Sequence, residues 1–307
     1  MKGTATMDAK ELKDIARRCG ADLVGIASMD RFGPLPPEQN PGMIFPECRS
    51  VIVLGRRILR GALRGVEEGT NFHSTYAMFG FRWLEDNFLS KTTYDVTCAI
   101  EALGFEAVPL FGYALDGMPT GRPVAPGKPA PNVIVDLDFA AQAAGLGEMG
   151  LGGFFLTPEY GPRQRFALIL TDAALEPDPV RGKTICGDCG LCAKACPFGA
   201  IRLEQQTSVG VPGHQMKVAA VDYAVCRSCP NGAMQGPGRG SRPDRCAAAC
   251  VRACVVQLES KGKLAQKFAH PFRKREPWAL DIYQRPVQVS AELGKHGCDD
   301  LVGQKKG

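Results

Sequence analysis

The apolar and polar residues along positions 8–172 follow patterns that predict strands and helices in alternation. Runs rich in β-branched and other apolar residues predict strands at 22–28, 50–58, 105–113, 131–138 and 163–172. Apolar residues at helical spacing predict helices at 8–20, 71–103 and 139–147. Asp8, with Glu11 three positions later, predicts the start of the first helix. Strands and helices that alternate in this way predict a layered α/β core.

The composition changes at Cys186. From there to Cys254 the chain is rich in cysteine, glycine and proline, which predicts a second, smaller module beside the core. We therefore expect three parts: an α/β core at 1–180, a module at 181–258 and a tail at 259–307. The tail holds ten Lys and Arg against six Asp and Glu, so it carries +4 of the net charge of +5. We expect this basic tail to contact an acidic redox partner or another subunit.

Neither a membrane span nor a secretory leader is predicted. No apolar run approaches the roughly 18 residues that a bilayer-spanning helix needs, and the first residues are charged where a signal peptide is apolar. We expect a cytoplasmic protein. Thiols stay reduced in that compartment, so the 13 cysteines indicate metal binding rather than a disulfide framework.

Four of the cysteines lie within one short motif. "CGDCGLCAKACP", residues 186–197, has the C-x2-C-x2-C-x3-C-P spacing that holds iron–sulfur clusters, in which the fourth thiol serves a second cluster. Zinc is the alternative, but zinc sites normally use separated C-x2-C pairs. We predict that one 4Fe–4S cluster is held by Cys186, Cys189, Cys192 and Cys254. We predict that a second is held by Cys196, Cys226, Cys246 and Cys250. Cys229 either replaces Cys226 or is a free thiol.

Several further segments carry a family resemblance. "AGLGE" (144–148), "TPEYGPRQR" (157–165), "LTD" (170–172) and "FPECRSVIVLG" (45–55) precede the cysteine motif. With these segments the chain resembles, over residues 8–258, the reductive dehalogenases and the epoxyqueuosine reductases. The resemblance implies a flavin-reductase-like (nitroreductase-type) α/β core that binds cobalamin, followed by a bacterial ferredoxin-like module with two 4Fe–4S clusters.

The resemblance also implies roles for individual residues. Asp136 matches the aspartate that is the proposed proton donor of epoxyqueuosine reductase, and Tyr160 is a second catalytic candidate. The alternative is that Asp136 or Asp138 caps the following helix, a role that suits Asp138 better. The residues expected to approach the cofactor are Gly145, Gly147, Gly150, Gly152, Arg163 and Arg165. Glycines permit close approach of the backbone to a flat cofactor.

The sequence therefore predicts a cytoplasmic iron–sulfur reductase. Two clusters would pass electrons to cobalamin for the reductive cleavage of a small organic substrate. The expected electron donor is a protein of ferredoxin or flavodoxin type. A homodimer is one arrangement that the chain is expected to adopt. The tail is too short for the helical-repeat segment with which epoxyqueuosine reductases hold tRNA, so no nucleic-acid partner is expected. Leu151 stands where family members often have Lys or Arg. This departure favours the alternative, a corrinoid-free electron-transfer protein that serves a partner enzyme.

Overall fold

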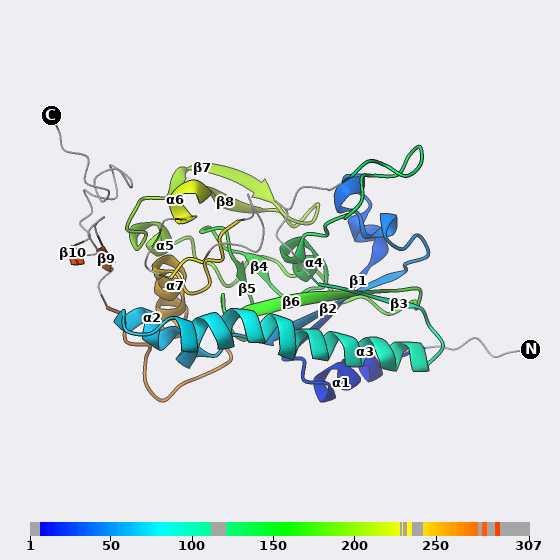
Figure 1. Cartoon of the computed structure of the whole chain (residues 1–307), viewed down its shortest axis with the longest axis horizontal. Helices are drawn as coiled ribbons and strands as arrows, with labels where there is room; N and C mark the ends of the chain where they lie inside the picture. The colour runs from blue at the N-terminus through cyan, green and yellow to red at the C-terminus, as the bar shows by residue number, and fades with distance from the viewer. Residues whose placement is uncertain are drawn as a thin grey trace, which may run out of the picture.

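The computed structural model describes residues 7–111, 121–227, 229, 232–234 and 242–275, together with the backbone of two short strands at 278–280 and 286–288. Its centre is a four-stranded sheet in the order β1-β2-β6-β3, in which all neighbouring strands are antiparallel (Figure 1). The strands are β1 (Leu23–Ser28), β2 (Ser50–Arg57), β6 (Gln164–Thr171) and β3 (Ala107–Leu110). Four of the five predicted strands are thus confirmed, within a mixed α and β fold.

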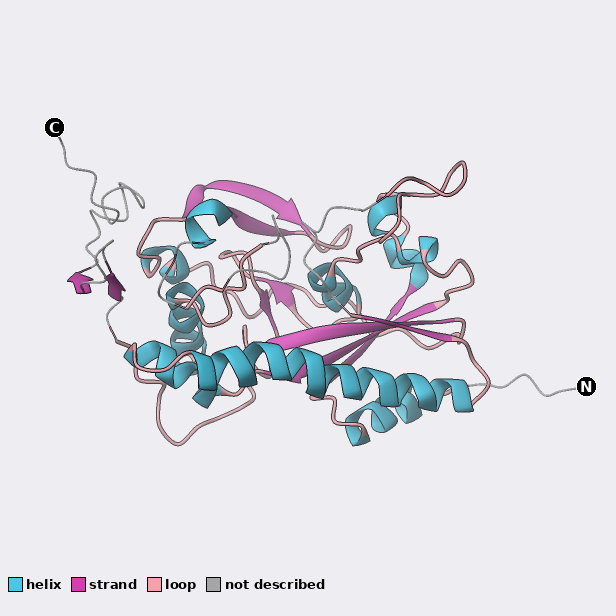
Figure 2. Ribbon diagram, in the orientation of Figure 1, coloured by secondary structure: helices cyan, strands magenta, loops and turns pink. Residues whose placement is uncertain are grey.

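Helices cover both faces of this sheet. Side chains alternate along a strand, so Ile52 of β2 packs on one face and Val53 on the other. Helices α1 (Ala9–Arg18) and α3 (Ser90–Ala102) cover the first face, and α4 (Leu137–Ala143) covers the second, as Figure 2 shows. The start of α1 is as predicted, because the side chain of its N-cap residue accepts the N–H of the third helical residue at 3.3 Å.

A long helical stretch crosses the molecule beside the sheet and is drawn in cyan in Figure 1. It consists of η5 (His73–Arg82), η6 (Leu84–Leu89) and α3, which confirms the helix predicted at 71–103. Its first part is wider than an α-helix, since the N–H of Ala77 donates to the carbonyl of Phe72, five residues earlier, at 3.0 Å. Widened turns of this kind occur frequently at functional sites.

The strand predicted at 131–138 is wrong. Residues 131–136 form no strand, and α4 already begins at Leu137. Pro131 has no N–H to donate to a sheet, and Asn132 has a φ of 69°, which breaks an extended run. The N–H of Ile134 instead donates to the carbonyl of Glu38 in a loop, at 3.0 Å.

The cysteine-rich part packs against one end of the core. It contains short helices, as predicted, and also a β-hairpin that the sequence did not reveal. A small hairpin of β4 (Glu148–Met149) and β5 (Phe155–Leu156) joins it to the core. The helices and strands of the cysteine-rich part are α5 (Leu191–Lys194), β7 (Ile201–Val209), β8 (Met216–Val221), α6 (Tyr223–Arg227) and α7 (Ala249–Ser260). The division at residues 180 and 258 stays a prediction.

The remaining elements are short. They are η1 (Met29–Phe32), η2 (Pro37–Gln39), η3 (Pro41–Met43), η4 (Arg60–Leu63), α2 (Arg64–Glu68), β9 (Trp278–Leu280) and β10 (Pro286–Gln288), of which the last two pair with each other. The stretch at 115–131 is rich in Gly and Pro, which predicts a loop, and its residues 115–120 lie outside the described residues. Within the described part of the chain, every helix is too short or too polar to cross a bilayer.

Candidate active site

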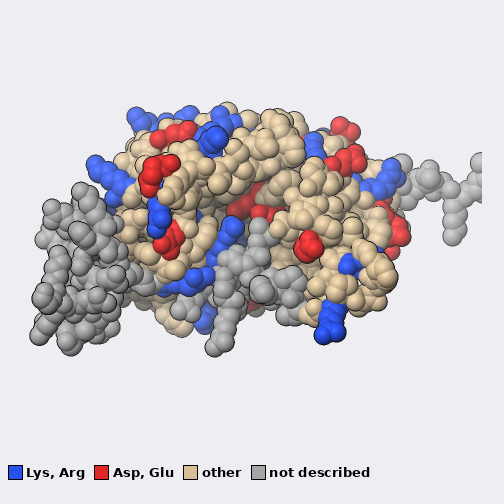
Figure 3. Space-filling view, turned by 90° about the horizontal axis from the view of Figure 1, so that it is seen from above, with Lys and Arg blue, Asp and Glu red and all other residues tan. Residues whose placement is uncertain are grey.

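A cavity of about 610 Å³ lies between the core and the cysteine-rich part. A volume of this size is typical of cofactor and substrate sites. Its walls combine aromatic rings, among them Phe81, Phe154 and Phe166, with charged side chains. The face seen in Figure 3 is hollowed between two lobes, and acidic and basic side chains meet in the hollow. The charged and polar residues that line the cavity include Glu85, Asp136, Asp138, Arg165, Arg242, Asp244, Arg245 and Cys246.

Asp136 and Asp138 both line the cavity. The sequence favoured Asp138 as the cap of the following helix, but Asp136 is the residue that caps it. The carboxylate of Asp136 accepts the N–H groups of Asp138 at 2.8 Å and Phe139 at 3.1 Å, so Asp136 is the N-cap of α4. Asp138 faces the cavity and is otherwise enclosed by protein. Burial, together with the charge of Asp136, raises the pKa of Asp138 to about 7. Asp138 is therefore one carboxyl group at the cavity that is suited to carry a proton at neutral pH.

Arg165, a predicted cofactor residue, does lie at the cavity, where it holds a buried polar network. Its guanidinium is 2.8 Å from the carboxylate of Asp244 and 3.3 Å from that of Glu85. It also donates to the hydroxyl of Tyr76 at 2.8 Å, and this hydroxyl donates to Asp244 at 2.5 Å. The network joins β6, the long helical stretch and the cysteine-rich part, which fixes the walls of the cavity relative to one another.

The two carboxyl groups beside Arg165 differ in their acidity. Burial raises the pKa of Glu85 to about 7, in spite of the opposing charge of Arg165. Burial also acts on Asp244, but the charge of Arg165 and the hydrogen bonds outweigh it and lower the pKa of Asp244. Among the carboxyl groups that line the cavity, that of Asp244 thus has a lowered pKa, whereas those of Glu85 and Asp138 have pKa values raised to about 7.

Two predicted site residues lie away from the cavity wall. The guanidinium of Arg163 is buried and donates to the carbonyl of Ile58 at 2.9 Å and to the amide oxygen of Gln266 at 2.7 Å, which ties two loops together. Tyr160 packs at the edge of the core with the guanidinium of Arg57 6.0 Å from its ring centroid. Neither side chain is among those that line the cavity.

The four predicted glycines also pack against the chain itself. A Cβ atom at Gly145 would meet the carbonyl oxygen of Pro179 at 2.4 Å, and one at Gly147 would meet that of Leu156 at 2.0 Å. A Cβ atom at Gly150 would lie 3.0 Å from the Leu156 side chain. Gly152 lies against the ring of Phe154 and the thiol of Cys192, at 2.6 and 2.9 Å from a Cβ. These glycines permit close packing of the segment on its neighbours, and the adjacent Gly153 is the one that lines the cavity.

The first predicted set of thiols is brought together in the structure. Burial raises the pKa of Cys254 well above its ordinary value, and the charges of the nearby Cys192, Cys186 and Cys189, and also of Cys250, raise it further. The buried carboxylate of Glu148, which the sequence analysis missed, accepts the N–H groups of residues 184, 185 and 186 at 2.5, 3.0 and 2.6 Å. Glu148 therefore holds the start of the cysteine loop in place.

Three of the four thiols predicted for the second cluster line a separate small cavity. The thiols around this cavity are those of Cys196, Cys226, Cys229 and Cys250. Cys246, predicted as the fourth ligand, lines the large cavity instead. Among the residues that the structure describes, no three Cys, His, Asp or Glu side chains are gathered as closely as a single metal ion requires.

Leu151 is buried among the cysteine-rich part and not at the large cavity. It packs with Cys192, Ile201 and Ala219, and its N–H points to the thiol of Cys186 at 3.4 Å. Its carbonyl accepts the N–H of Ala219 at 2.9 Å. Leu151 therefore packs against both the first set of thiols and the β7–β8 hairpin. It does not change the charge of the large cavity, because it does not line it.

Comparisons with known proteins agree with these features. The 4Fe-4S binding domain family matches residues 180–202, which confirms the predicted iron–sulfur motif. The tetrachloroethene reductive dehalogenase of Sulfurospirillum multivorans is 28% identical over 244 residues, which cover 67% of this chain and 43% of that protein. The corresponding enzyme of Desulfitobacterium hafniense is 32% identical over 127 residues, 40% of this chain and 19% of that protein.

A second group of enzymes is similar over a shorter stretch. The epoxyqueuosine reductase of Listeria monocytogenes is 38% identical over 61 residues, 20% of this chain and 16% of that protein. The matched part of the chain thus spans less than half the length of each of these curated relatives.

Solved structures of reductive dehalogenases share the fold. The catabolic reductive dehalogenase NpRdhA has a TM-score of 0.53 at 16% identity, over 90% of this chain and 42% of that chain. A reductive dehalogenase structure described as suggesting a mechanism for B12-dependent dehalogenation has a TM-score of 0.52 at 18% identity, over 84% of this chain and 35% of that chain. The chain thus combines a 4Fe–4S motif with sequence similarity to reductive dehalogenases and, over a shorter stretch, to epoxyqueuosine reductases, and it shares the fold of the reductive dehalogenases.

Proposed function

We propose that the chain carries two 4Fe–4S clusters and binds cobalamin in the large cavity, where a small organic substrate is reductively cleaved. The main support for the proposal is that one residue lines both the large cavity and the small cavity of thiols. Arg245 lines both the large cavity and the small cavity of thiols, and its buried guanidinium donates to the carbonyl of Gly152 at 3.0 Å. Electrons that leave the second set of thiols would thus have a single layer of protein to cross before they reach the large cavity.

The residues of the large cavity fit a corrinoid. Its aromatic side chains offer flat apolar surface for a macrocycle, and its rim of charged groups offers partners for the amide groups that a corrinoid carries. Gly153 contributes a stretch of wall without a side chain. When bound, cobalamin supplies the reductive metal chemistry, while the protein supplies binding, orientation and a proton.

The proton is assigned to Asp138 in this proposal. Replacement of a leaving group by hydrogen consumes two electrons and one proton, so a proton donor is needed inside the cavity. The carboxyl of Asp138 faces the cavity, and its pKa of about 7 leaves it partly protonated at neutral pH. The charge of Asp136, the cap of α4, favours the protonated form of its neighbour. The proposal therefore moves the acid by two residues from the position that the resemblance implied.

The charge distribution also bears on the electron donor. We extend the proposal to a donor of ferredoxin or flavodoxin type, since the positive charge of residues 259–307 attracts acidic redox partners. The alternative, an electron-transfer protein without a corrinoid, rested on Leu151. Because Leu151 is packed away from the large cavity, the missing cation does not weaken the case for a cofactor there.

The test is an anaerobic titration of the full chain with cobalamin after reconstitution of its clusters. We expect a base-off absorption spectrum that saturates at one equivalent. The absence of binding would reject the enzyme and leave the electron-transfer protein. With tetrachloroethene as the first substrate probe, Asp138→Asn should bind the corrinoid with unchanged stoichiometry and lose most of its turnover. If Asp138→Asn turned over normally, the proton would have to come from another group, and Glu85 would be the next to test.

A further inference from the structure

The geometry points to Cys229, and not Cys246, as the fourth ligand of the second 4Fe–4S cluster, with Cys246 left as a free thiol on the wall of the large cavity. This inference rests on the proposed second cluster and names its ligands. Cys229, which the sequence analysis assigned to neither cluster, thereby becomes a ligand.

The first argument is the composition of the small cavity. Its wall holds thiols from four places in the chain: Cys196 after α5, Cys226 in α6, Cys229 in the turn that follows, and Cys250 in α7. The N–H of Cys229 donates to the carbonyl of Cys226 at 3.1 Å, and this tight turn brings the two thiols to one cavity. Four cysteines are what a cubane cluster requires.

The second argument is the backbone between Cys246 and Cys250. These residues are four apart, a spacing that would place them on one face of a helix. Helix α7 begins only at Ala249, however, and its N-cap Ala248 is extended, with a ψ of 156°. Cys250 and Cys254 therefore lie one turn apart in α7, whereas Cys246 lies before the helix and does not share its face.

The third argument is the surroundings of Cys246. Its N–H donates to the carboxylate of Asp244 at 3.0 Å, which ties it to the network of Arg165 in the large cavity. The charged groups beside its thiol, Arg165, Asp244 and Asp138, all line the large cavity. By contrast, Cys226 and Cys250 line the small cavity together with Cys196. Cys246 thus belongs to the cofactor cavity by position and by charge.

Single substitutions separate the two ligand sets. The full chain and three variants, Cys229→Ala, Cys246→Ala and Cys250→Ala, are reconstituted anaerobically, and iron and sulfide are measured per chain. We expect about eight iron atoms in the wild type, a loss of about half in Cys250→Ala as the positive control, and a loss of the same size in Cys229→Ala. Cys246→Ala should keep the full content. A full content in Cys229→Ala together with half in Cys246→Ala would overturn the inference.

A wild type that holds only about four iron atoms per chain would reject the second cluster itself, which is a different failure. A second measurement covers variants that fold poorly. In the reconstituted wild type, without cobalamin, prolonged treatment with iodoacetamide at alkaline pH, which offsets the protonation of the buried Cys246 thiol, should modify Cys246 and spare Cys229, as peptide mass analysis would show. Modification of Cys229 with protection of Cys246 would overturn the inference without any substitution.

Discussion

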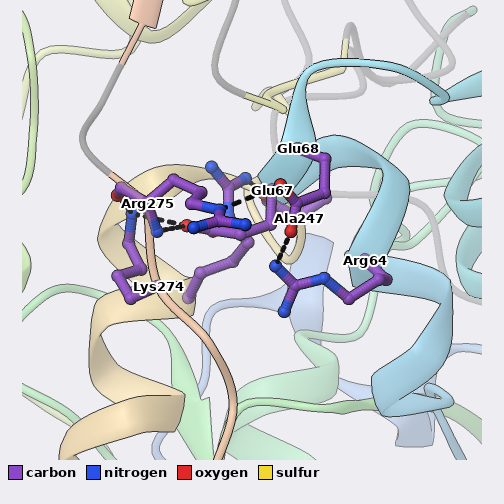
Figure 4. A network of polar contacts seen from close by, with 7 residues as sticks. Arg64, Glu67, Glu68, Ala247, Lys274 and Arg275 are labelled. Carbon is purple, nitrogen blue, oxygen red and sulfur yellow. Dashed lines mark hydrogen bonds and ion pairs between the residues drawn. The ribbon is translucent and has the colours of Figure 1, made fainter.

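The carboxylate of Glu67 in α2 and the guanidinium of Arg252 in α7 form an ion pair whose side chains are 0% and 1% exposed, and Figure 4 shows Glu67 beside its further partners Lys274 and Arg275. Arg252 lies between Cys250 and Cys254, so the pair anchors the helix that contributes a thiol to each set. Glu67 also accepts from the ammonium of Lys274 at 3.0 Å and from the backbone N–H of Arg275. One buried carboxylate therefore joins α2, the cysteine helix and the chain that follows it.

Loss of this carboxylate should destabilise the protein strongly. Glu67→Gln removes the negative charge that faces the buried guanidinium of Arg252, and the loss of one partner of a buried ion pair typically costs about 3–5 kcal/mol. We expect a lower free energy of unfolding in urea and a lower iron content at equal protein concentration. Glu68→Gln is the matched control, since Glu68 pairs with Arg64 and Arg275 at the surface. Equal stability of the Glu67→Gln and Glu68→Gln proteins would show that the buried pair is not the anchor.

The stability of the cobalamin-free protein should fall as the pH rises from about 4 to about 7. The unfolded Asp titrates near pH 4, whereas burial and the charge of Asp136 raise the pKa of Asp138 to about 7 in the folded protein. Between these values the folded protein holds a proton that the unfolded chain has lost, so the free energy of unfolding decreases with pH. Glu85, whose pKa is also raised to about 7 by burial, acts in the same direction.

Urea unfolding curves at several pH values test this dependence. Asp138→Asn should reduce the decline between pH 4 and pH 7, and the double variant with Glu85→Gln should reduce it further. If the Asp138→Asn protein kept the full slope of the wild type, the carboxyl of Asp138 would titrate as it does in the unfolded chain.

Local pattern was sufficient where structure depends on neighbours in sequence. The buried strands β2 and β6, the cap at Asp8 and the cysteine motif at 186–197 were all predictable, because each is set by a few consecutive residues. The choice between Asp136 and Asp138 was harder. Both are good capping residues, and the helix start at Leu137 decides which of them caps and which faces the cavity.

The cavity itself could not be predicted from local pattern. Glu85, Arg165 and Asp244 are far apart in the chain, and only the packing of the helical stretch and the cysteine-rich part on the sheet brings them together. The glycines of 145–152 were expected to approach a cofactor, yet glycine serves equally where two segments of the same chain approach closely. Sequence alone does not distinguish these two uses.

Gly152 should be needed for the first cluster. A Cβ atom at this position would lie 2.9 Å from the thiol of Cys192 and 2.6 Å from the ring of Phe154. We expect Gly152→Ala to displace that ligand and to lower the iron content by up to about half, the share of one cluster in two. Gly182→Ala is the matched control, because no atom lies within 4 Å of the added Cβ. Unchanged iron in both variants would mean that the loop shifts to accept the methyl group.

Arg245 should set the reduction potential of the second cluster. Its guanidinium is buried, lines the small cavity and acts on the thiols of Cys226 and Cys250. Reduction adds one negative charge to a cluster, so a nearby positive charge stabilises the reduced form and raises the potential. We expect Arg245→Met to lower the midpoint potential of that cluster alone, while Arg245→Lys, which keeps the charge, stays closer to the wild type. An anaerobic redox titration followed by electron paramagnetic resonance measures both clusters in one sample. Equal potentials in Arg245→Met and the wild type, at full iron content, would show that this charge does not act on the cluster.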